Sequence, residues 1–176
     1  KQSRACQTES AFLDAFAVQL QKKGFHETTV SEIADAAKMT RGAFMTRFGS
    51  KRAALTVLFQ RFCDDVMNTL DEFQQSAVGE TDVQDLCFKI STQYEGLVRK
   101  HWGANRAMHE IFLMEGKIDD QTKGIFKATV AMLSELIVQF GIRPPPAAVF
   151  AAVQLMVTIN YNYVLLAMPG LPEDHD

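Results

Sequence analysis

Three cationic side chains, Arg41, Arg47 and Lys51, stand without an acidic one in the segment 39–51, MTRGAFMTRFGSK. The chain has 176 residues and a formal net charge of -3, so this basic segment runs against its overall balance. Lys and Arg gain affinity for polyanions because they neutralise phosphates and release counterions. Charge alone fits a solvated surface better than a binding site. The secondary structure that carries these cations must therefore be used to choose between the two.

The charge is shared unevenly along the chain. Residues 1–52 hold nine Lys or Arg against five Asp or Glu, whereas residues 53–176 hold nine against sixteen. A basic first part and an acidic second part indicate two different kinds of partner. The first part favours a polyanion, and the second argues mildly for a neutral or cationic ligand over an anion.

Signatures of catalysis and of metal binding are absent from the sequence. The three cysteines are odd in number and lack CxxC spacing, so neither a disulfide framework nor a zinc knuckle is indicated, and a reducing cytoplasm fits. There is no Gly-rich phosphate loop and no GxSxG motif. The candidate metal ligands His101, His109, Glu110 and Glu115 lack the helical spacing that pairs two ligands. We therefore predict no enzyme, no metal site and no cofactor.

Apolar residues at helical spacing set the framework around the basic segment. Phe12, Phe16 and Leu20 recur every fourth residue, which predicts a helix over 8–23 that stops before Gly24. In TTVSEIADAAK, residues 28–38, the threonine and glutamate of TVSE have the spacing of a capping box and start a second helix. After a turn, Thr40 can cap a third helix over 41–47.

Two short helices joined by a tight turn form a helix-turn-helix. The second of them enters the major groove of DNA, and the residues at its beginning reach the base edges. This arrangement explains why an acidic chain keeps a purely basic segment, and it predicts double-stranded DNA as a partner. The residues predicted to contact DNA are Thr29, Thr40, Arg41, Gly42, Ala43, Met45, Arg47 and Lys51.

The segment GFHETTVSEIADAAKMTRGAFMTRFGSKRAAL, residues 24–55, resembles the tetracycline-repressor (TetR) family of transcriptional regulators. The positions that match the family pattern are Gly24, Phe25, Thr28, Thr29, Val30, Ile33, Ala34, Ala37, Thr40, Gly42, Phe48 and Lys51. The resemblance implies a three-helix DNA-binding domain, a longer linking helix, and an all-α second domain that dimerises and often binds a small effector.

Two positions depart from the family pattern. Lys38 stands where the family has a turn glycine, and a left-handed non-glycine residue costs of order 1 kcal/mol, so we expect a slightly different turn. Met45 replaces a tyrosine that commonly contacts a phosphate. Its thioether cannot donate that hydrogen bond, so apolar contact with a thymine methyl group is the expected substitute.

The remainder of the chain also has helical periodicity. We expect helices over about 51–75, 81–101, 104–114, 119–140 and 146–168. The last is long enough to span a bilayer, but polar residues interrupt it and no basic flank anchors it, so a buried helix and no membrane contact are predicted. The prediction is thus an all-α cytoplasmic protein with a helix-turn-helix DNA-binding domain over 1–50 and a helical effector-binding and dimerisation domain over 51–176.

Two sets of side chains in the second domain are candidates for binding. Met and aromatic residues line adaptable apolar pockets, although each one alone is a more ordinary core residue. The predicted ligand-binding residues are Met67, Tyr94, Trp102, Met108, Phe112, Phe126, Asn160 and Tyr161. The last helix is apolar on more faces than one partner helix can cover, which predicts a homodimer with two-fold symmetry. The predicted dimerisation residues are Val149, Val153, Met156, Asn160 and Tyr163.

Three interpretations from different classes follow. The first is a dimeric repressor that a small, largely apolar effector releases from a palindromic operator. The second is a constitutive DNA-binding dimer without a small-molecule ligand, which shares the DNA site and differs only in the pocket. The third is an enzyme, for which the sequence offers no nucleophile, metal or cofactor signature.

Overall fold

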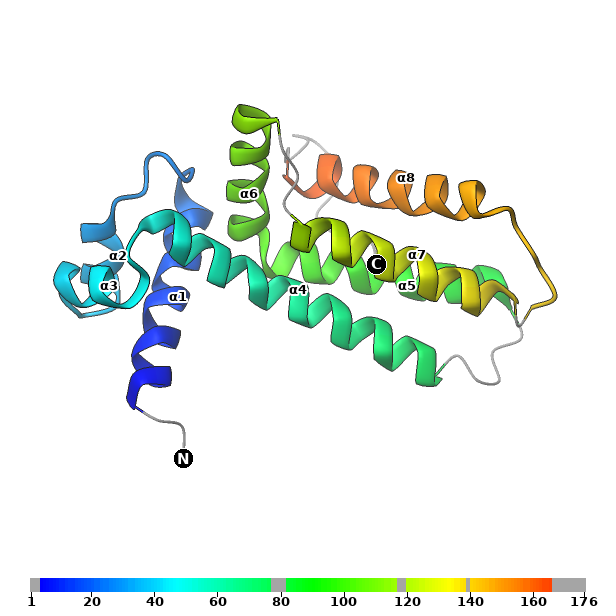
Figure 1. Ribbon diagram of the computed structural model, residues 1–176, viewed down its shortest axis with the longest axis horizontal. Coiled ribbons are helices and arrows are strands. Elements are labelled where there is room, and N and C mark those ends of the chain that lie inside the picture. Colours follow the sequence, from blue (N-terminus) through cyan, green and yellow to red (C-terminus); the bar gives the residue numbers. More distant parts are fainter. Residues whose placement is uncertain (1–3, 77–81, 117–119, 139, 166–176) are drawn as a thin grey trace, which may run out of the picture. The chain divides into compact units, whose positions relative to one another are not determined.

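A computed structural model of the chain describes residues 4–76, 82–116, 120–138 and 140–165, and these residues form eight α-helices and no strand (Figure 1). The all-α fold class with an N-terminal helix-turn-helix is thereby confirmed. The helices belong to two compact units, Lys1–Phe62 with His101–Lys117 and Cys63–Lys100 with Ile118–Asp176. Among the described residues, no helix combines the length and the apolar character that crossing a membrane requires.

The first unit contains α1 (Arg4–Lys22), α2 (Val30–Ala36), α3 (Arg41–Phe48), the beginning of α4 (Lys51–Ser76) and α6 (Trp102–Glu115). Its core is built from apolar residues of all five helices. The buried members are Phe12, Leu13, Phe16, Leu20, Phe25, Ile33, Ala34, Phe44, Ala54, Leu55, Leu58, Ala104, Ala107 and Ile111. Burial of this set at roughly 25 cal/mol per Å² of apolar surface holds the short helices α2 and α3, which are too short to be stable alone.

The first unit extends beyond the domain predicted over residues 1–50. Leu55 and Leu58 of α4 and Ile111 of α6 complete its core, so these segments belong to the first unit. Gly103 shows how closely α6 approaches α1, because a Cβ there would lie 2.8 Å from the Cβ of Leu20. This packing was not predictable from sequence patterns, because α6 begins about fifty residues after α3 ends.

Local chemistry explains where α2 and α3 begin and end. Thr29 caps α2 in a capping box with Glu32, as predicted, and Thr40 caps α3 by accepting a hydrogen bond from the N–H of Ala43 at 3.1 Å. Between the helices Lys38 has φ 56°, the left-handed conformation that usually favours glycine. The N–H of Met39 donates to the Ala34 carbonyl at 2.9 Å, which is the pattern of a Schellman motif.

Replacing Lys38 by glycine is expected to stabilise the chain by up to about 1 kcal/mol, because glycine adopts a left-handed conformation without a Cβ penalty. The gain is smaller than the full penalty, since glycine also loses more backbone freedom on folding. Lys38→Ala is the matched control, because it removes the same charge and keeps the Cβ. Urea unfolding should rank the glycine variant above the parent; equal stability of the glycine and alanine variants would contradict backbone strain at this turn.

The second unit contains the rest of α4 together with α5 (Val83–Lys100), α7 (Asp120–Val138) and α8 (Pro146–Leu165). Helix α8 packs against α5 and α7, and α7 and α8 lie side by side as the short connection between them predicts (Figure 1). Proline is tolerated as the first residue of α8 because the N–H at that position has no helical partner. The buried apolar residues of this unit include Val66, Leu70, Phe73, Leu86, Ile90, Val98, Met132, Leu136, Val149 and Val153.

Candidate nucleic-acid interface

The beginning of α3 lies on the surface of the first unit. Arg41, Gly42 and Ala43 are all exposed there, directly after the cap residue Thr40. A Cβ on Gly42 would meet only the Thr40 hydroxyl, at 3.9 Å, so packing within the chain does not require a glycine. The absence of a side chain therefore leaves room for a partner to approach the backbone, where N–H groups of a helix N-terminus attract phosphate.

The apolar side of α3 determines which residues face outward. Phe44 is completely buried, and its ring contacts the rings of Phe12 at 5.4 Å and Phe48 at 4.9 Å. Thr46 lies two residues from each phenylalanine of α3, and at 3.6 residues per turn this places it on the opposite side, where it is exposed. The sequence interpretation missed Thr46. The spacing of the two phenylalanines could have identified it, because it defines the opposite side of α3. A threonine hydroxyl can hydrogen-bond to any base.

The cations of the first unit differ in how free they are. Arg41 and Lys38 are exposed, and neither has an ion pair within the residues that the structure describes. Arg47, at the end of α3, donates from Nε to the Glu9 carboxylate of α1 at 2.6 Å, and a guanidinium Nη2 contacts the same oxygen. An exposed pair of this kind is worth little, so Arg47 can exchange Glu9 for a phosphate at small cost. Arg41 needs no such exchange.

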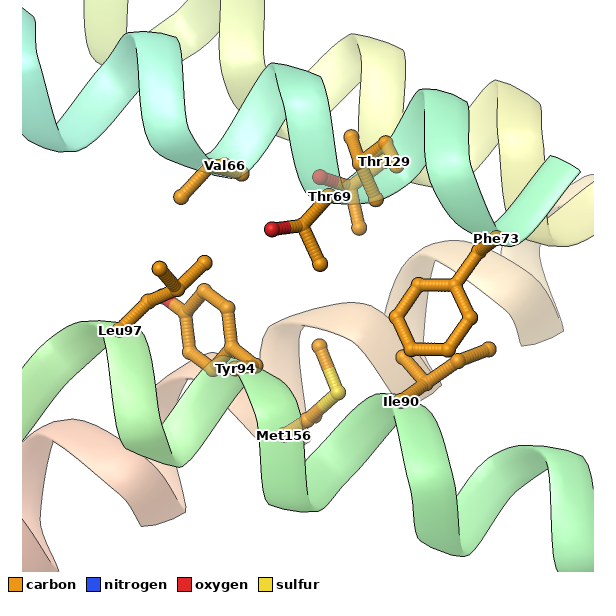
Figure 2. Close-up of a pocket in the computed structure, with 9 residues that line it drawn as sticks. Val66, Thr69, Phe73, Ile90, Tyr94, Leu97, Thr129 and Met156 are labelled. Carbon is orange, nitrogen blue, oxygen red and sulfur yellow. The ribbon is translucent and has the colours of Figure 1, made fainter.

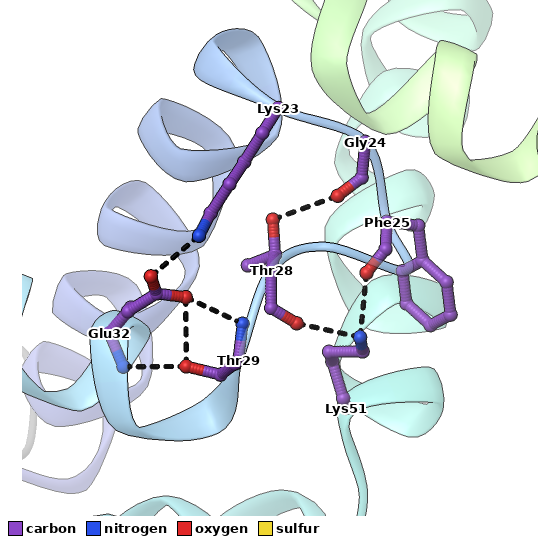
Figure 3. Close-up of polar contacts among 7 residues, drawn as sticks. All are labelled: Lys23, Gly24, Phe25, Thr28, Thr29, Glu32 and Lys51. Atoms are coloured by element: carbon purple, nitrogen blue, oxygen red, sulfur yellow. Dashed lines mark hydrogen bonds and ion pairs between the residues drawn. The ribbon is translucent and has the colours of Figure 1, made fainter.

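Lys51 makes two hydrogen bonds within the chain, so its predicted contact with DNA stays a prediction (Figure 3). Its Nζ donates to the carbonyl of Phe25 at 2.6 Å and to that of Thr28 at 2.7 Å, and lies 4.3 Å from the centre of the Phe25 ring. Desolvation lowers the pKa of Lys51. Since an ammonium has three N–H groups, one is left for a phosphate. The geometry gives Lys51 a role in holding the loop between α1 and α2.

Thr29 is also engaged within the chain. Its hydroxyl donates to Oε2 of Glu32 at 2.8 Å and accepts from the N–H of the same residue at 3.3 Å (Figure 3). A lone pair of this exposed hydroxyl remains for a partner, so the predicted contact of Thr29 with DNA stays a prediction. Met45 is 40% exposed on α3, which suits apolar contact with a thymine methyl group.

The capping box makes the start of α2 sensitive to acid. The hydrogen bond from Lys23, at 2.5 Å, and those from Thr29 lower the pKa of Glu32 from 4.5 to about 2. A depressed pKa means that the stabilisation is complete above pH 4.5 and is lost as the pH falls through 2. Glu32→Gln should therefore flatten the acid dependence of the melting temperature in this range, whereas Glu95→Gln, in an exposed pair within α5, should keep the slope of the parent. Parallel slopes for all three proteins would contradict this assignment.

A narrow cavity lies among α4, α5, α7 and α8 in the second unit (Figure 2). Its volume is about 20 Å³, which is room for about one water molecule. The lining residues are Val66, Thr69, Leu70, Phe73, Ile90, Tyr94, Leu97, Thr129 and Met156. Burial raises the pKa of Tyr94 to about 12, so its hydroxyl remains protonated at neutral pH. A more open groove of about 190 Å³ lies between α4 and α7 and includes Met67.

The predicted ligand-binding residues do not gather at one site. Tyr94 lines the narrow cavity and Met67 the groove, while the ring of Phe126 contacts that of Phe150 at 5.0 Å. Three of the others, Trp102, Met108 and Phe112, lie on α6 in the first unit, because the sequence did not reveal that α6 packs with α1. The side chains of the remaining two, Asn160 and Tyr161, fall outside the described residues.

The predicted dimerisation residues need a similar correction. Val149 and Val153 are 4% and 1% exposed in a single chain, so they are core residues of the second unit and cannot face a second copy. Met156 lines the narrow cavity. The side chains of Asn160 and Tyr163 fall outside the described residues. Among the side chains of α8 that the structure describes, the exposed ones are instead Pro146, Ala147, Ala148, Phe150, Ala151, Ala152, Gln154, Leu155 and Thr158.

These features define the class of the first unit as a helix-turn-helix DNA-binding domain. Comparison with known proteins agrees, because residues 12–56 match the family of bacterial regulatory proteins described as tetR. A segment of 74 residues is 32% identical to YerO, an uncharacterized HTH-type transcriptional regulator of Bacillus subtilis (strain 168), and covers 42% of this chain and 26% of that protein. The match thus spans about a quarter of the relative's length.

Solved structures share the fold along nearly the whole chain. A transcriptional regulator from Aquifex aeolicus VF5 has a TM-score of 0.68 and 15% identity, with 95% of this chain and 90% of that chain covered. The fatty acid degradation regulator FadR from Bacillus halodurans has a TM-score of 0.66 and 17% identity, with coverage of 96% and 88%. The chain shares its fold with these regulators and its residues 12–56 match the tetR family, so the resemblance predicted from the sequence is confirmed.

Proposed function

We propose that this chain is a transcriptional repressor that binds a palindromic operator as a homodimer. The observation that carries the proposal is the exposed beginning of α3, where Arg41 has no ion pair in the described structure and Gly42 leaves the backbone open. Arg41, Thr46 and Met45 would meet base edges, and Arg47 with the backbone N–H groups after Thr40 would meet phosphates. Lys51 is assigned to loop positioning, with one N–H left for a phosphate.

The dimer is supported by the exposed side of α8. Ala148, Ala151, Ala152 and Leu155 project on the side of the helix away from Val153, and all four are exposed in a single chain. Small side chains allow two helices to approach closely, and covering Leu155 removes apolar surface from water. Pairing of this face with its own copy gives two-fold symmetry.

Selection of bound sequences from a random DNA pool tests this proposal directly. Two-fold symmetry predicts that the retained sequences carry two inverted half-sites whose centres lie about 34 to 36 Å apart, or a multiple of this distance. Affinity should fall steeply with salt, because each phosphate contact releases a counterion. A pool that yields no enriched sequence, or only sequences without inverted symmetry, would overturn the proposed operator.

We propose further that a small, largely apolar effector releases the dimer from its operator. Ligand pockets usually have volumes of about 300 to 1,000 Å³, so the narrow cavity beside Tyr94 would have to widen on binding. The volume of about 20 Å³ specifically favours the alternative, a constitutive DNA-binding dimer without a ligand. A thermal-shift screen of neutral and cationic apolar compounds separates the two, because only an effector both raises the melting temperature and releases the operator.

A further inference from the structure

The loop between α1 and α2 is held by a carboxylate from a distant helix. The backbone N–H of Phe25 donates to Oε2 of Glu110 at 3.0 Å, although the two residues are 85 positions apart and Glu110 lies on α6. The other oxygen, Oε1, accepts from Nε of Arg106 one turn earlier on α6, also at 3.0 Å. The Arg106 guanidinium in turn lies 5.2 Å from the centre of the Trp102 ring. Arg106 therefore holds the Glu110 carboxylate in the orientation in which it accepts the hydrogen bond from the loop.

The loop is shaped to receive this carboxylate. A Cβ on Gly24 would lie 3.0 Å from Oε1 and 3.2 Å from Oε2 of Glu110, closer than side-chain carbons normally come. A side chain at residue 24 would therefore displace the Glu110 carboxylate, whereas the backbone conformation of Gly24 does not itself call for glycine, because it is not left-handed. The tight contact of Gly103 with Leu20 brings α6 near enough to α1 for the hydrogen bond to form.

Both backbone polar groups of Phe25 form hydrogen bonds with side chains of α4 and α6. Glu110 of α6 accepts a hydrogen bond from the Phe25 N–H. Lys51 of α4 donates to the Phe25 carbonyl and to that of Thr28 (Figure 3). Thr28 is 1% exposed and its hydroxyl donates back to the Gly24 carbonyl at 3.0 Å. The next residue, Thr29, is the cap of α2. Hydrogen bonds therefore connect α6 to the loop as far as Thr28, and the peptide bond from Thr28 to Thr29 continues to the beginning of α2.

We propose that Glu110 is a positioning residue for DNA binding: by accepting the Phe25 N–H, it fixes the loop from which α2 starts and so sets the helix-turn-helix for the operator. The inference rests on the proposed function. It gives α6 an indirect role in DNA binding, which is to position the loop that precedes α2. If Glu110 is removed, the buried N–H of Phe25 loses its acceptor and the loop populates other conformations. The affinity for DNA then falls in proportion to the fraction of chains that keep the competent loop.

The test compares the parent with Glu110→Ala and Glu110→Gln by two measurements, operator affinity and hydrogen exchange of the Phe25 amide. Because the lost acceptor is charged, the alanine variant should bind the operator about tenfold more weakly and exchange the amide faster. The glutamine variant loses the ion pair with Arg106 but keeps an acceptor oxygen. It should recover most of the affinity and most of the protection, whereas a purely structural ion pair predicts no recovery.

Two further variants sharpen the test. Gly24→Ala pushes the carboxylate away from the loop side without removing it, so it should weaken operator binding in the same direction as Glu110→Ala. Glu115→Gln removes another α6 carboxylate, which pairs with Arg52 of α4 and does not contact the loop, so it should cause no loss of affinity. All affinities are measured well below the melting temperature of the least stable variant. Weaker binding then reports a displaced loop and not a fraction of unfolded protein.

The outcomes are distinct. A glutamine variant that recovers affinity and amide protection supports the inference. A parent that binds the operator while Glu110→Ala binds equally well overturns the inference alone, and so does a glutamine variant no better than alanine. A parent that retains no sequence from the random pool overturns the proposed function and the inference with it.

Discussion

Arg41→Ala should bind the selected operator about 1 to 3 kcal/mol more weakly than the parent, which is roughly five- to 150-fold, if the guanidinium reads a guanine. Arg41 is the first residue of α3 and has no ion pair in the part of the chain that the structure describes, so its whole fork of donors is available. Bidentate contact with the O6 and N7 atoms of guanine uses two of these donors.

Anisotropy titrations across a range of salt concentrations measure this effect. A base contact relaxes specificity at one operator position, whereas a phosphate contact weakens all sequences alike and reduces the salt slope by about one. Arg99→Ala is the control, because this exposed arginine of α5 is paired with Glu95 and its loss removes the same charge. If the Arg41 and Arg99 variants bind the operator equally well, α3 is wrongly assigned as the recognition helix.

The helix-turn-helix was predictable because its determinants are local. The capping box at Thr29, the cap at Thr40 and the core positions of Phe44 and Phe48 all follow from spacings of three or four residues. The strained turn at Lys38 was also visible, since a lysine stands where a glycine is expected. The helix bounds agree with the predicted ones to within a few residues for the same reason.

The role of Lys51 could not be predicted from local spacing. Its position at the beginning of α4 suggests a phosphate contact. In the folded chain, however, its ammonium group donates hydrogen bonds to the carbonyls of Phe25 and Thr28. Carbonyl oxygens that close a loop are invisible in sequence patterns, because every residue carries one. The contact of Glu110 with Phe25 was hidden for the same reason, and the two residues are 85 positions apart.

The second unit was less predictable because almost every face of its last helix is apolar. In such a helix hydrophobic periodicity does not tell the buried side from the side that meets another copy. Val149 and Val153 were therefore assigned to the dimer although they belong to the core of one chain. Only the packing of α8 against α5 and α7 separates the two sides.

Leu155→Asp should convert the proposed dimer into a monomer and cause the largest loss of operator affinity. Leu155 is 60% exposed in a single chain and lies beside exposed alanines on α8, so a second copy would cover it. Two aspartates brought together at a two-fold axis repel each other and lose water. Two half-sites held by one dimer gain avidity of about 10²- to 10⁴-fold, and this factor disappears when the copies separate.

Analytical ultracentrifugation at micromolar concentration and titration of the palindromic operator provide the two measurements. Phe88→Asp is the matched control, since Phe88 is 71% exposed on α5 and no part of the proposed pairing face. It should remain a dimer with the operator affinity of the parent, and circular dichroism should show that both variants keep the helical fold. Because Leu155 is exposed, its replacement should change the stability of one chain by less than about 0.5 kcal/mol. A Leu155→Asp variant that sediments as a dimer and binds the operator like the parent would place the pairing face elsewhere.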